Sequence, residues 1–102
     1  LTAADSGKTF VSATDGVVFT LPAIATGAVF KFVNAAEDGT NTLTISPNAS
    51  DGIDYAGSKT DDKDVINTKA TSKQGDFIVI ASLSSTTHWS VTSVRGVFAK
   101  ES

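Results

Sequence analysis

Hydrophobic and polar residues alternate along several short segments of the chain. In residues 28–34, Phe30 and Phe32 point to one side and Lys31 points to the other. The segment Asn41–Ser46 repeats the pattern with two aliphatic and three hydroxyl-bearing side chains. Successive side chains of a β-strand point to opposite faces, so this spacing predicts strands with one buried and one solvent-facing side.

Two further strands are predicted near the start of the chain, at Thr9–Ser12 and Val17–Leu21. The four residues between them end in Asp15-Gly16, and Asp-Gly between two β-rich runs is typical of a hairpin turn. We therefore expect these strands to form a β-hairpin. Residues 1–7 are predicted to form a short helical turn that precedes it.

The segment Phe77–Leu83 is apolar on both faces. Phe77 and Val79 lie on one face of the predicted strand, and Ile78 and Ile80 lie on the other. A strand of this kind is usually covered on both sides. We expect its own domain or a partner to provide that cover.

The next strand, His88–Val94, is predicted to return with Trp89 and Val91 facing inward. Its alternation breaks at Ser93–Val94. Because an extra residue in one strand shifts the phase of its side chains, we expect a β-bulge near Arg95–Gly96.

Residues 53–73 carry a weaker pattern, with short apolar islands in a polar stretch. We interpret this region as an ordered surface loop with one or two brief strands. The whole chain is then one all-β domain over residues 1–102, with a short N-terminal helical turn. It should be a small β-sandwich or β-barrel of about seven to nine short, mostly antiparallel strands.

Composition agrees with this fold and narrows the function. Val and Ile together number sixteen against four Leu, and β-branched side chains favour strands. The net charge is −3 and the eight basic residues are scattered, which argues against binding to nucleic acid. Cysteine is absent, so the chain has no disulfide, thiolate nucleophile or cysteine-based zinc site.

The first residue is Leu rather than Met. We therefore expect that the chain is processed, truncated or excised from something longer, and that an N-terminal arm could be missing from it. No apolar run approaches the ~20 residues that span a bilayer, and no signal-peptide pattern opens the chain. We expect no membrane partner.

His88 is the only histidine and hence the first candidate for catalysis. A catalytic histidine needs an orienting partner and a nucleophile, and no such set stands out, so we expect His88 to start a hairpin strand instead. Asp61, Asp62 and Asp64 form the densest carboxylate cluster, which could attract Ca²⁺. Two lysines interrupt the run and the EF-hand spacing is absent, so a solvated loop is favoured. We expect no cofactor and no metal.

Two aromatic residues could contact a sugar ring. Trp89 alternates in phase with Val91 and is expected in the core, so Tyr55 is the better candidate for a glycan contact. The triplet Asn48-Ala49-Ser50 fits the glycosylation sequon. It is better explained as a turn.

Several blocks of the sequence, taken in order, carry a resemblance to a known family. These blocks are Leu1–Phe10, Leu21-Pro22, Gly27 with Val29–Val33, Gly75–Ile80, His88–Val91 and Arg95–Phe98. Their order resembles small β-rich virion proteins of tailed bacteriophages, particularly the head decoration (cement) proteins. Similar blocks also occur in domains of phage tail fibres and spikes. The similarity covers most of the chain, and the loop Ile53–Ser72 has no counterpart.

This resemblance implies a non-enzymatic protein on the outer surface of a phage capsid, assembled in the host cytoplasm. Such a protein binds the major capsid protein and stabilises contacts between neighbouring capsid subunits, usually as a homotrimer at three-fold or quasi-three-fold positions. No active-site residue carries over to this chain. Three weak contacts on a lattice would act together through their effective concentration.

We expect the contact with other subunits or with the capsid at Ile78 and Ile80 on the doubly apolar strand, and at Val97 and Phe98 near the C-terminus. The alternative is a tail-fibre or receptor-binding module that recognises bacterial surface sugars with Tyr55. A polysaccharide-acting enzyme fragment is a third, remote interpretation. It is disfavoured because no carboxylate pair lies on a clear strand pattern.

Overall fold

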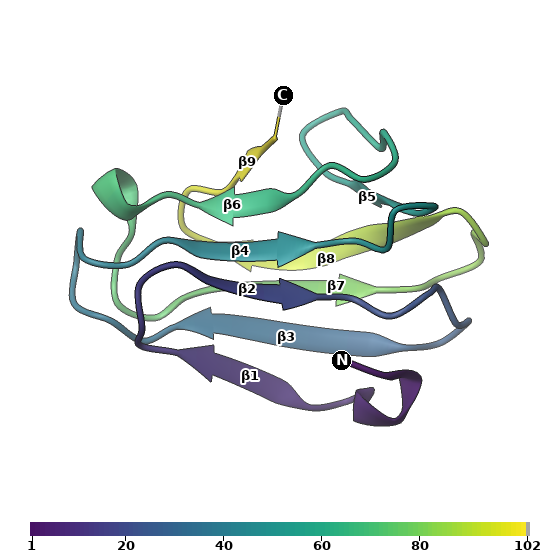
Figure 1. Ribbon diagram of the computed structural model, residues 1–102, viewed down its shortest axis with the longest axis horizontal. Coiled ribbons are helices and arrows are strands. Elements are labelled where there is room, and N and C mark those ends of the chain that lie inside the picture. The colour runs from purple at the N-terminus through teal and green to yellow at the C-terminus, as the bar shows by residue number, and fades with distance from the viewer. Residues whose placement is uncertain (102) are drawn as a thin grey trace.

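A computed structural model describes residues 1–101 of the protein as a sandwich of two β-sheets (Figure 1). The strands are β1 (Thr9–Ser12), β2 (Val17–Thr20), β3 (Val29–Asn34), β4 (Leu43–Ser46), β5 (Gly52–Asp54), β6 (Val65–Asn67), β7 (Asp76–Ala81), β8 (His88–Arg95) and β9 (Ala99–Lys100). Two 3₁₀ turns are η1 (Ala3–Asp5) and η2 (Lys69–Thr71). One sheet has the order β1-β3-β7-β8-β5 and the other β2-β4-β6-β9. The predicted all-β fold and the N-terminal helical turn are confirmed.

Antiparallel pairs outnumber parallel pairs, as expected. The four antiparallel pairs are β3–β7, β4–β6, β6–β9 and β7–β8. The three parallel pairs are β1–β3, β2–β4 and β5–β8. Two parallel neighbours need a long connection between them. The connection from β1 to β3 contains β2, and the connection from β2 to β4 contains β3, each a strand of the opposite sheet.

The predicted N-terminal hairpin is wrong. β1 and β2 belong to different sheets, and each pairs in parallel with a later strand. Their inward aromatic rings, Phe10 and Phe19, meet across the interior with centroids 5.6 Å apart. The loop between them is bound to the start of β4: Gly16 N–H donates to the Thr42 carbonyl at 3.1 Å, and Asp15 Oδ1 accepts from Thr42 N–H at 2.9 Å. The Asp-Gly pair therefore carries the chain from one sheet to the other.

Replacing Asp15 by Asn is expected to remove an acid-sensitive part of the stability. The Lys69 ammonium, 2.5 Å from Asp15 Oδ2, and the Thr42 N–H hold the pKa of Asp15 below its ordinary value. A carboxyl group whose pKa is lowered by folding stabilises the protein above its unfolded pKa of about 3.9. That contribution disappears as the pH falls through the lower folded value. Urea unfolding should show a loss for Asp15→Asn near neutral pH that shrinks at about pH 2. Equal losses at both pH values would contradict this.

Aromatic and aliphatic side chains from both sheets fill the interior. The alternation predicted for β3 and β4 is confirmed, because Phe30, Phe32 and the two aliphatic residues of β4 are fully buried. Four phenylalanine rings, at positions 10, 19, 30 and 32, lie with centroid separations between 5.3 and 6.5 Å. Trp89 packs edge-on to Phe30 at 5.7 Å, which confirms its predicted place in the core.

Residues 53–73 contain two brief strands, β5 and β6, as predicted. The apolar islands of this segment are part of the core rather than of a surface loop, since Ile53 and Val65 are fully buried. The polar residues between them form the exposed connection. The segment therefore adds β5 to the edge of the five-stranded sheet and places β6 between β4 and β9 in the other sheet.

A network of buried polar side chains connects the two sheets. Asn34 Nδ2 donates to the Asn41 carbonyl at 3.1 Å and to Asn67 Oδ1 at 2.8 Å, and Asn41 Nδ2 donates to Asn34 Oδ1 at 3.0 Å. Asn67 Nδ2 donates to Asp76 Oδ2 at 3.2 Å and to the Val97 carbonyl at 3.0 Å. The side chains of Asn34, Asn41, Asn67 and Asp76 are at most 2% exposed. Buried amides with these partners fix the relative position of the two sheets.

Candidate functional site

The outer face of the five-stranded sheet carries a group of neighbouring apolar side chains that no second layer covers. Strand register places Val11, Val33, Phe77 and Arg95 in one row across β1, β3, β7 and β8. The adjacent row contains Thr9, Lys31, Val79 and Ser93. We call the surface made by Val11, Val29, Val33, Phe77 and Val79 the apolar face. Val11 is 60% exposed, and no strand or helix of residues 1–101 belongs to a layer beyond this sheet.

Two cations lie on the apolar face. The Lys31 ammonium is 4.6 Å from the centroid of the Phe77 ring, a distance at which the cation is attracted to the ring's π-face. Arg95 lies at the β8 end of the same row as Phe77. The face therefore combines an apolar centre with positive charge.

The outer face of the four-stranded sheet has a different character. Its outward positions on β2, β4 and β6 are occupied by Val18, Thr20, Thr44, Ser46 and Ile66. Three of these five side chains carry hydroxyl groups, which water solvates well. The two faces of the sandwich are thus unequal, and the apolar one lies on the five-stranded sheet.

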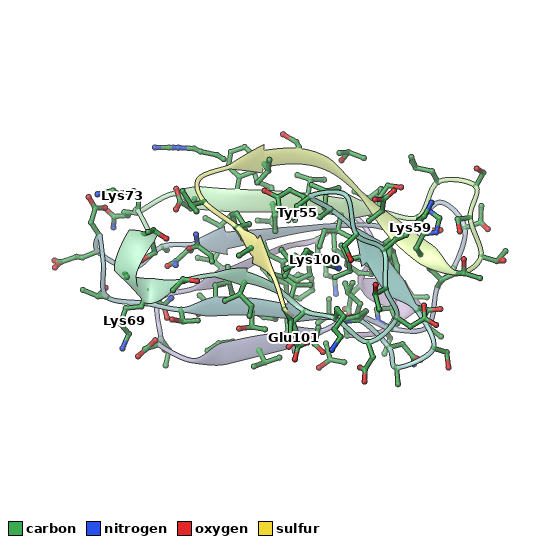
Figure 2. The ribbon with its side chains drawn as sticks, turned by 90° about the horizontal axis from the view of Figure 1, so that it is seen from above. Tyr55, Lys59, Lys69, Lys73, Lys100 and Glu101 are labelled. Carbon is green, nitrogen blue, oxygen red and sulfur yellow. The ribbon has the colours of Figure 1, made fainter. Side chains whose placement is uncertain are left out.

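A shallow groove runs along the edge of β8. It has a volume of about 510 Å³ and is lined by Asp54, Tyr55 and Ala56 and by residues 90–94. β5 pairs with only the first three residues of β8, at His88–Ser90, and the groove lies where that pairing ends. We call it the β8 groove. Figure 2 shows Tyr55 on the open side of the sandwich, between the two sheets.

A β-bulge shapes the wall of the β8 groove. Val79 is opposite Ser93 whereas Ile80 is opposite Val91, so Thr92 is the extra residue. The predicted bulge is therefore present but lies a few residues earlier than Arg95–Gly96. The extra residue shifts the alternation of side chains by one position, so that Val94 faces the interior side of β8 as Val91 does.

Lys100 connects the last strand of one sheet to the edge strand of the other. Its ammonium donates to the Ile53 carbonyl at 2.6 Å and to the Lys63 carbonyl at 3.4 Å, and so ties β9 to β5 (Figure 2). Burial lowers the pKa of Lys100, although the carboxylates of Asp54, Asp64 and Glu101 oppose this shift. The position of Lys100 is that of a structural tie between strands.

The predicted contact residues are divided between core and surface. Ile78 and Ile80 are fully buried, because their side of β7 is the inner side. They are inaccessible to another chain, so their assignment as contact residues is corrected. Phe98 is also buried against the core and is corrected for the same reason, whereas Val97 is 59% exposed. The accessible side of β7 carries Phe77 and Val79.

The remaining candidates lie in local structure. Ser85 Oγ is 3.1 Å from His88 Nδ1, and it also accepts from the Thr87 and His88 N–H groups, so the contact belongs to a serine-capped turn. Asn48 Oδ1 accepts from Ser50 N–H at 3.1 Å, which confirms the turn expected there. Tyr55 is half-buried and packs its ring against the core. One side of that ring is therefore unavailable to a ligand.

The acidic residues of the 53–73 segment do not converge. Within residues 1–101, no group of three or more His, Cys, Asp or Glu side chains is arranged to hold a metal ion. In the same part of the chain, no helix has the length and apolar character needed to cross a bilayer. The apolar face and the β8 groove are thus the two surfaces with distinctive chemistry.

The chain was also compared with known proteins. It matches no protein-family model, and neither the curated proteins nor the solved structures gave a significant match.

Proposed function

We propose that this protein is a non-enzymatic structural component of a tailed-phage virion that binds the outer surface of the capsid through the apolar face. The observation that carries the proposal is that Phe77 and Val79 have no covering layer from their own chain. Contiguous apolar surface of this kind marks interaction sites on soluble proteins. The resemblance to head decoration proteins supplies the class of partner.

The proposed partner is the major capsid protein, and the proposed form on the shell is a homotrimer that stabilises neighbouring capsid subunits. Lys31 and Arg95 make the apolar face positively charged. A capsid surface with an apolar centre and acidic residues around it would complement this face. Three such contacts per trimer would raise the avidity by roughly 10²–10⁴ over one contact.

Replacing Val11 by Asp is expected to weaken capsid binding at least about tenfold, which corresponds to about 1.4 kcal/mol. Val11 lies on the apolar face and is 60% exposed, so a carboxylate there would be desolvated on docking without disturbing the core. The matched control is Val18→Asp, because Val18 is a valine of similar exposure (55%) on an edge strand of the opposite sheet. Binding would be measured by cosedimentation with shells assembled from the major capsid protein of the same phage.

The control should bind within about twofold of the original protein. Equal losses for both variants, or no loss for Val11→Asp, would contradict the docking face. A third variant, Ile80→Asp, places a charge in the core and is expected to unfold the protein rather than to alter docking. Circular dichroism separates that outcome from the loss of a contact.

The second candidate is a receptor-binding module that recognises bacterial surface sugars. The observation in its favour is that Tyr55 borders the β8 groove together with hydroxyl and carboxylate side chains. Such a module would bind a glycan array and lose that binding in Tyr55→Ala. It would leave the melting temperature of capsid shells unchanged, whereas a decoration protein should raise it.

A further inference from the structure

Half of β8 has an open edge. β7 pairs with β8 as far as Arg95, whereas on the other side β5 pairs only with His88–Ser90. No other strand of residues 1–101 pairs with β8. Residues 92–95 are exposed on both faces of the strand. An edge of this kind presents unpaired N–H and C=O groups to any strand that approaches it.

A strained turn keeps this edge open. The chain leaves β5 at Tyr55 and reverses in a tight turn, in which Tyr55 and Ser58 exchange backbone hydrogen bonds of 3.0 and 3.1 Å. Both residues between them, Ala56 and Gly57, have positive φ, at 54° and 82°. This left-handed conformation is unfavourable for a residue with a side chain. The fold therefore maintains an unfavourable conformation at Ala56, at the point where a longer β5 would have covered β8.

The open edge is complementary to itself in an antiparallel arrangement. Asp54 lies opposite Ser90 and Arg95 lies opposite Phe77, and both pairs are on the outer side of the sheet. A second copy of the strand that places Val94 opposite Val94 would place Arg95 of the partner copy opposite Ser93. Asp54 lies opposite Ser90, and because Thr92 is the bulged residue, Ser93 is two strand positions beyond Ser90. Arg95 of the partner copy would therefore be about 7 Å along the sheet from Asp54, twice the rise per residue of a strand. Because the arrangement is two-fold symmetric, it would contain two pairs of Arg95 from one copy with Asp54 from the other.

We propose that the edge formed by Thr92–Arg95 of β8 and by Gly96 pairs with the same edge of a second copy of this chain, about a two-fold axis at Val94. The pairing joins two five-stranded sheets into one continuous sheet and brings Arg95 of each copy to Asp54 of the other. It also covers Val94, which is 40% exposed on the inner side of β8. A two-fold contact of this kind uses the same patch on both copies, so a single surface suffices.

This contact goes beyond the proposed capsid binding and does not depend on it. It is distinct from the three-fold contact that the resemblance implies. On a shell that carries trimers, a two-fold contact would join neighbouring trimers. In solution it can be measured without any capsid.

Crosslinking tests the position of the axis. The chain has no cysteine, so a single introduced thiol reports one site. In Val94→Cys, the two Cβ atoms would be about 4.5–5.5 Å apart across the axis, close enough for a disulfide after a small adjustment. Under mild oxidation we expect most of Val94→Cys to run as a covalent dimer, at least tenfold more than the matched control Val18→Cys. A monomeric Val94→Cys, or equal crosslinking of the two variants, would overturn the proposal.

A charge exchange tests the pairing of Asp54 with Arg95. Sedimentation equilibrium of the original protein should show a monomer–dimer equilibrium, which Asp54→Arg and Arg95→Asp each weaken at least about tenfold. The double variant, which exchanges the two charges, should recover dimerisation to within about threefold. A monomeric original protein, or a double variant as weak as the single ones, would show that the edge does not pair in this way. Circular dichroism confirms that each variant is folded.

Discussion

Replacing Gly96 by Ala is expected to lower the free energy of unfolding by more than about 3 kcal/mol. Gly96 has a φ of 101°, which side chains rarely adopt. An added Cβ would also overlap the carboxylate of Asp76. That carboxylate is buried and accepts from Asn67 Nδ2 and from Lys73 N–H, so it cannot move aside without breaking the polar network. An alanine at this position would therefore lose stability both through its backbone conformation and through its overlap with Asp76.

Gly57→Ala is the matched control for this prediction. Gly57 also has a positive φ, 82°, but no atom would lie within 4 Å of an added Cβ. Its cost should be that of the backbone alone, about 1–2 kcal/mol. Urea unfolding followed by the fluorescence of Trp89, the only tryptophan, would measure both variants. A Gly96→Ala protein no less stable than Gly57→Ala would mean that Asp76 is free to move.

Replacing Asn34 by Ala is expected to cost about 3 kcal/mol or more. The amide of Asn34 donates to the Asn41 carbonyl and to Asn67 Oδ1, and it accepts from Asn41 Nδ2 and from the N–H of Ala36. Removal would leave several buried groups without partners, and each unsatisfied group costs about 1–3 kcal/mol. The loss should appear in chemical unfolding near neutral pH.

Asn48→Ala provides the comparison. Asn48 also accepts a backbone hydrogen bond, but the bond lies in an exposed turn that water can reach. We expect its removal to cost less than about 1 kcal/mol. If the two variants were equally stable, the buried network would contribute no more than an ordinary turn.

The alternation of side chains was sufficient to predict the core strands. In β4 one face is apolar and the other polar, and in β3 the two large aromatic side chains, Phe30 and Phe32, lie on the face opposite Lys31 and are the ones buried. The pairing of strands was harder to predict. The Asp15-Gly16 pair suits a hairpin, but its flanking strands each found a partner much later in the chain. Local turn chemistry does not report such distant partners.

The polar network escaped prediction for a related reason. Asn34, Asn41 and Asn67 each lie at or near the end of an apolar run, where asparagine normally forms a turn. They are buried because the ends of strands from two sheets meet. Their partners lie up to 33 residues apart in sequence, and nothing in the local pattern connects them.

The candidate surface was predicted in part. The strand now assigned as β7 was expected to be apolar on both faces, and it is. When both faces are apolar, the two-residue period cannot show which one is the core, and Ile78 and Ile80 were assigned to the wrong side. The β8 groove could not be predicted, because it depends on where β5 stops pairing and on the position of the bulge at Thr92.

The interleaved order of the strands has a consequence for synthesis on the ribosome. β1 pairs only with β3, and the second neighbour of β3 is β7, which comes much later in the chain. The first sixty residues therefore contain no hairpin that could be stable alone, and a nascent chain would stay unfolded until residues 76–95 emerge. Domains with such distant pairings fold in roughly milliseconds to seconds. The emergence of β7 and β8, rather than that of the first strands, would then start the folding of this domain.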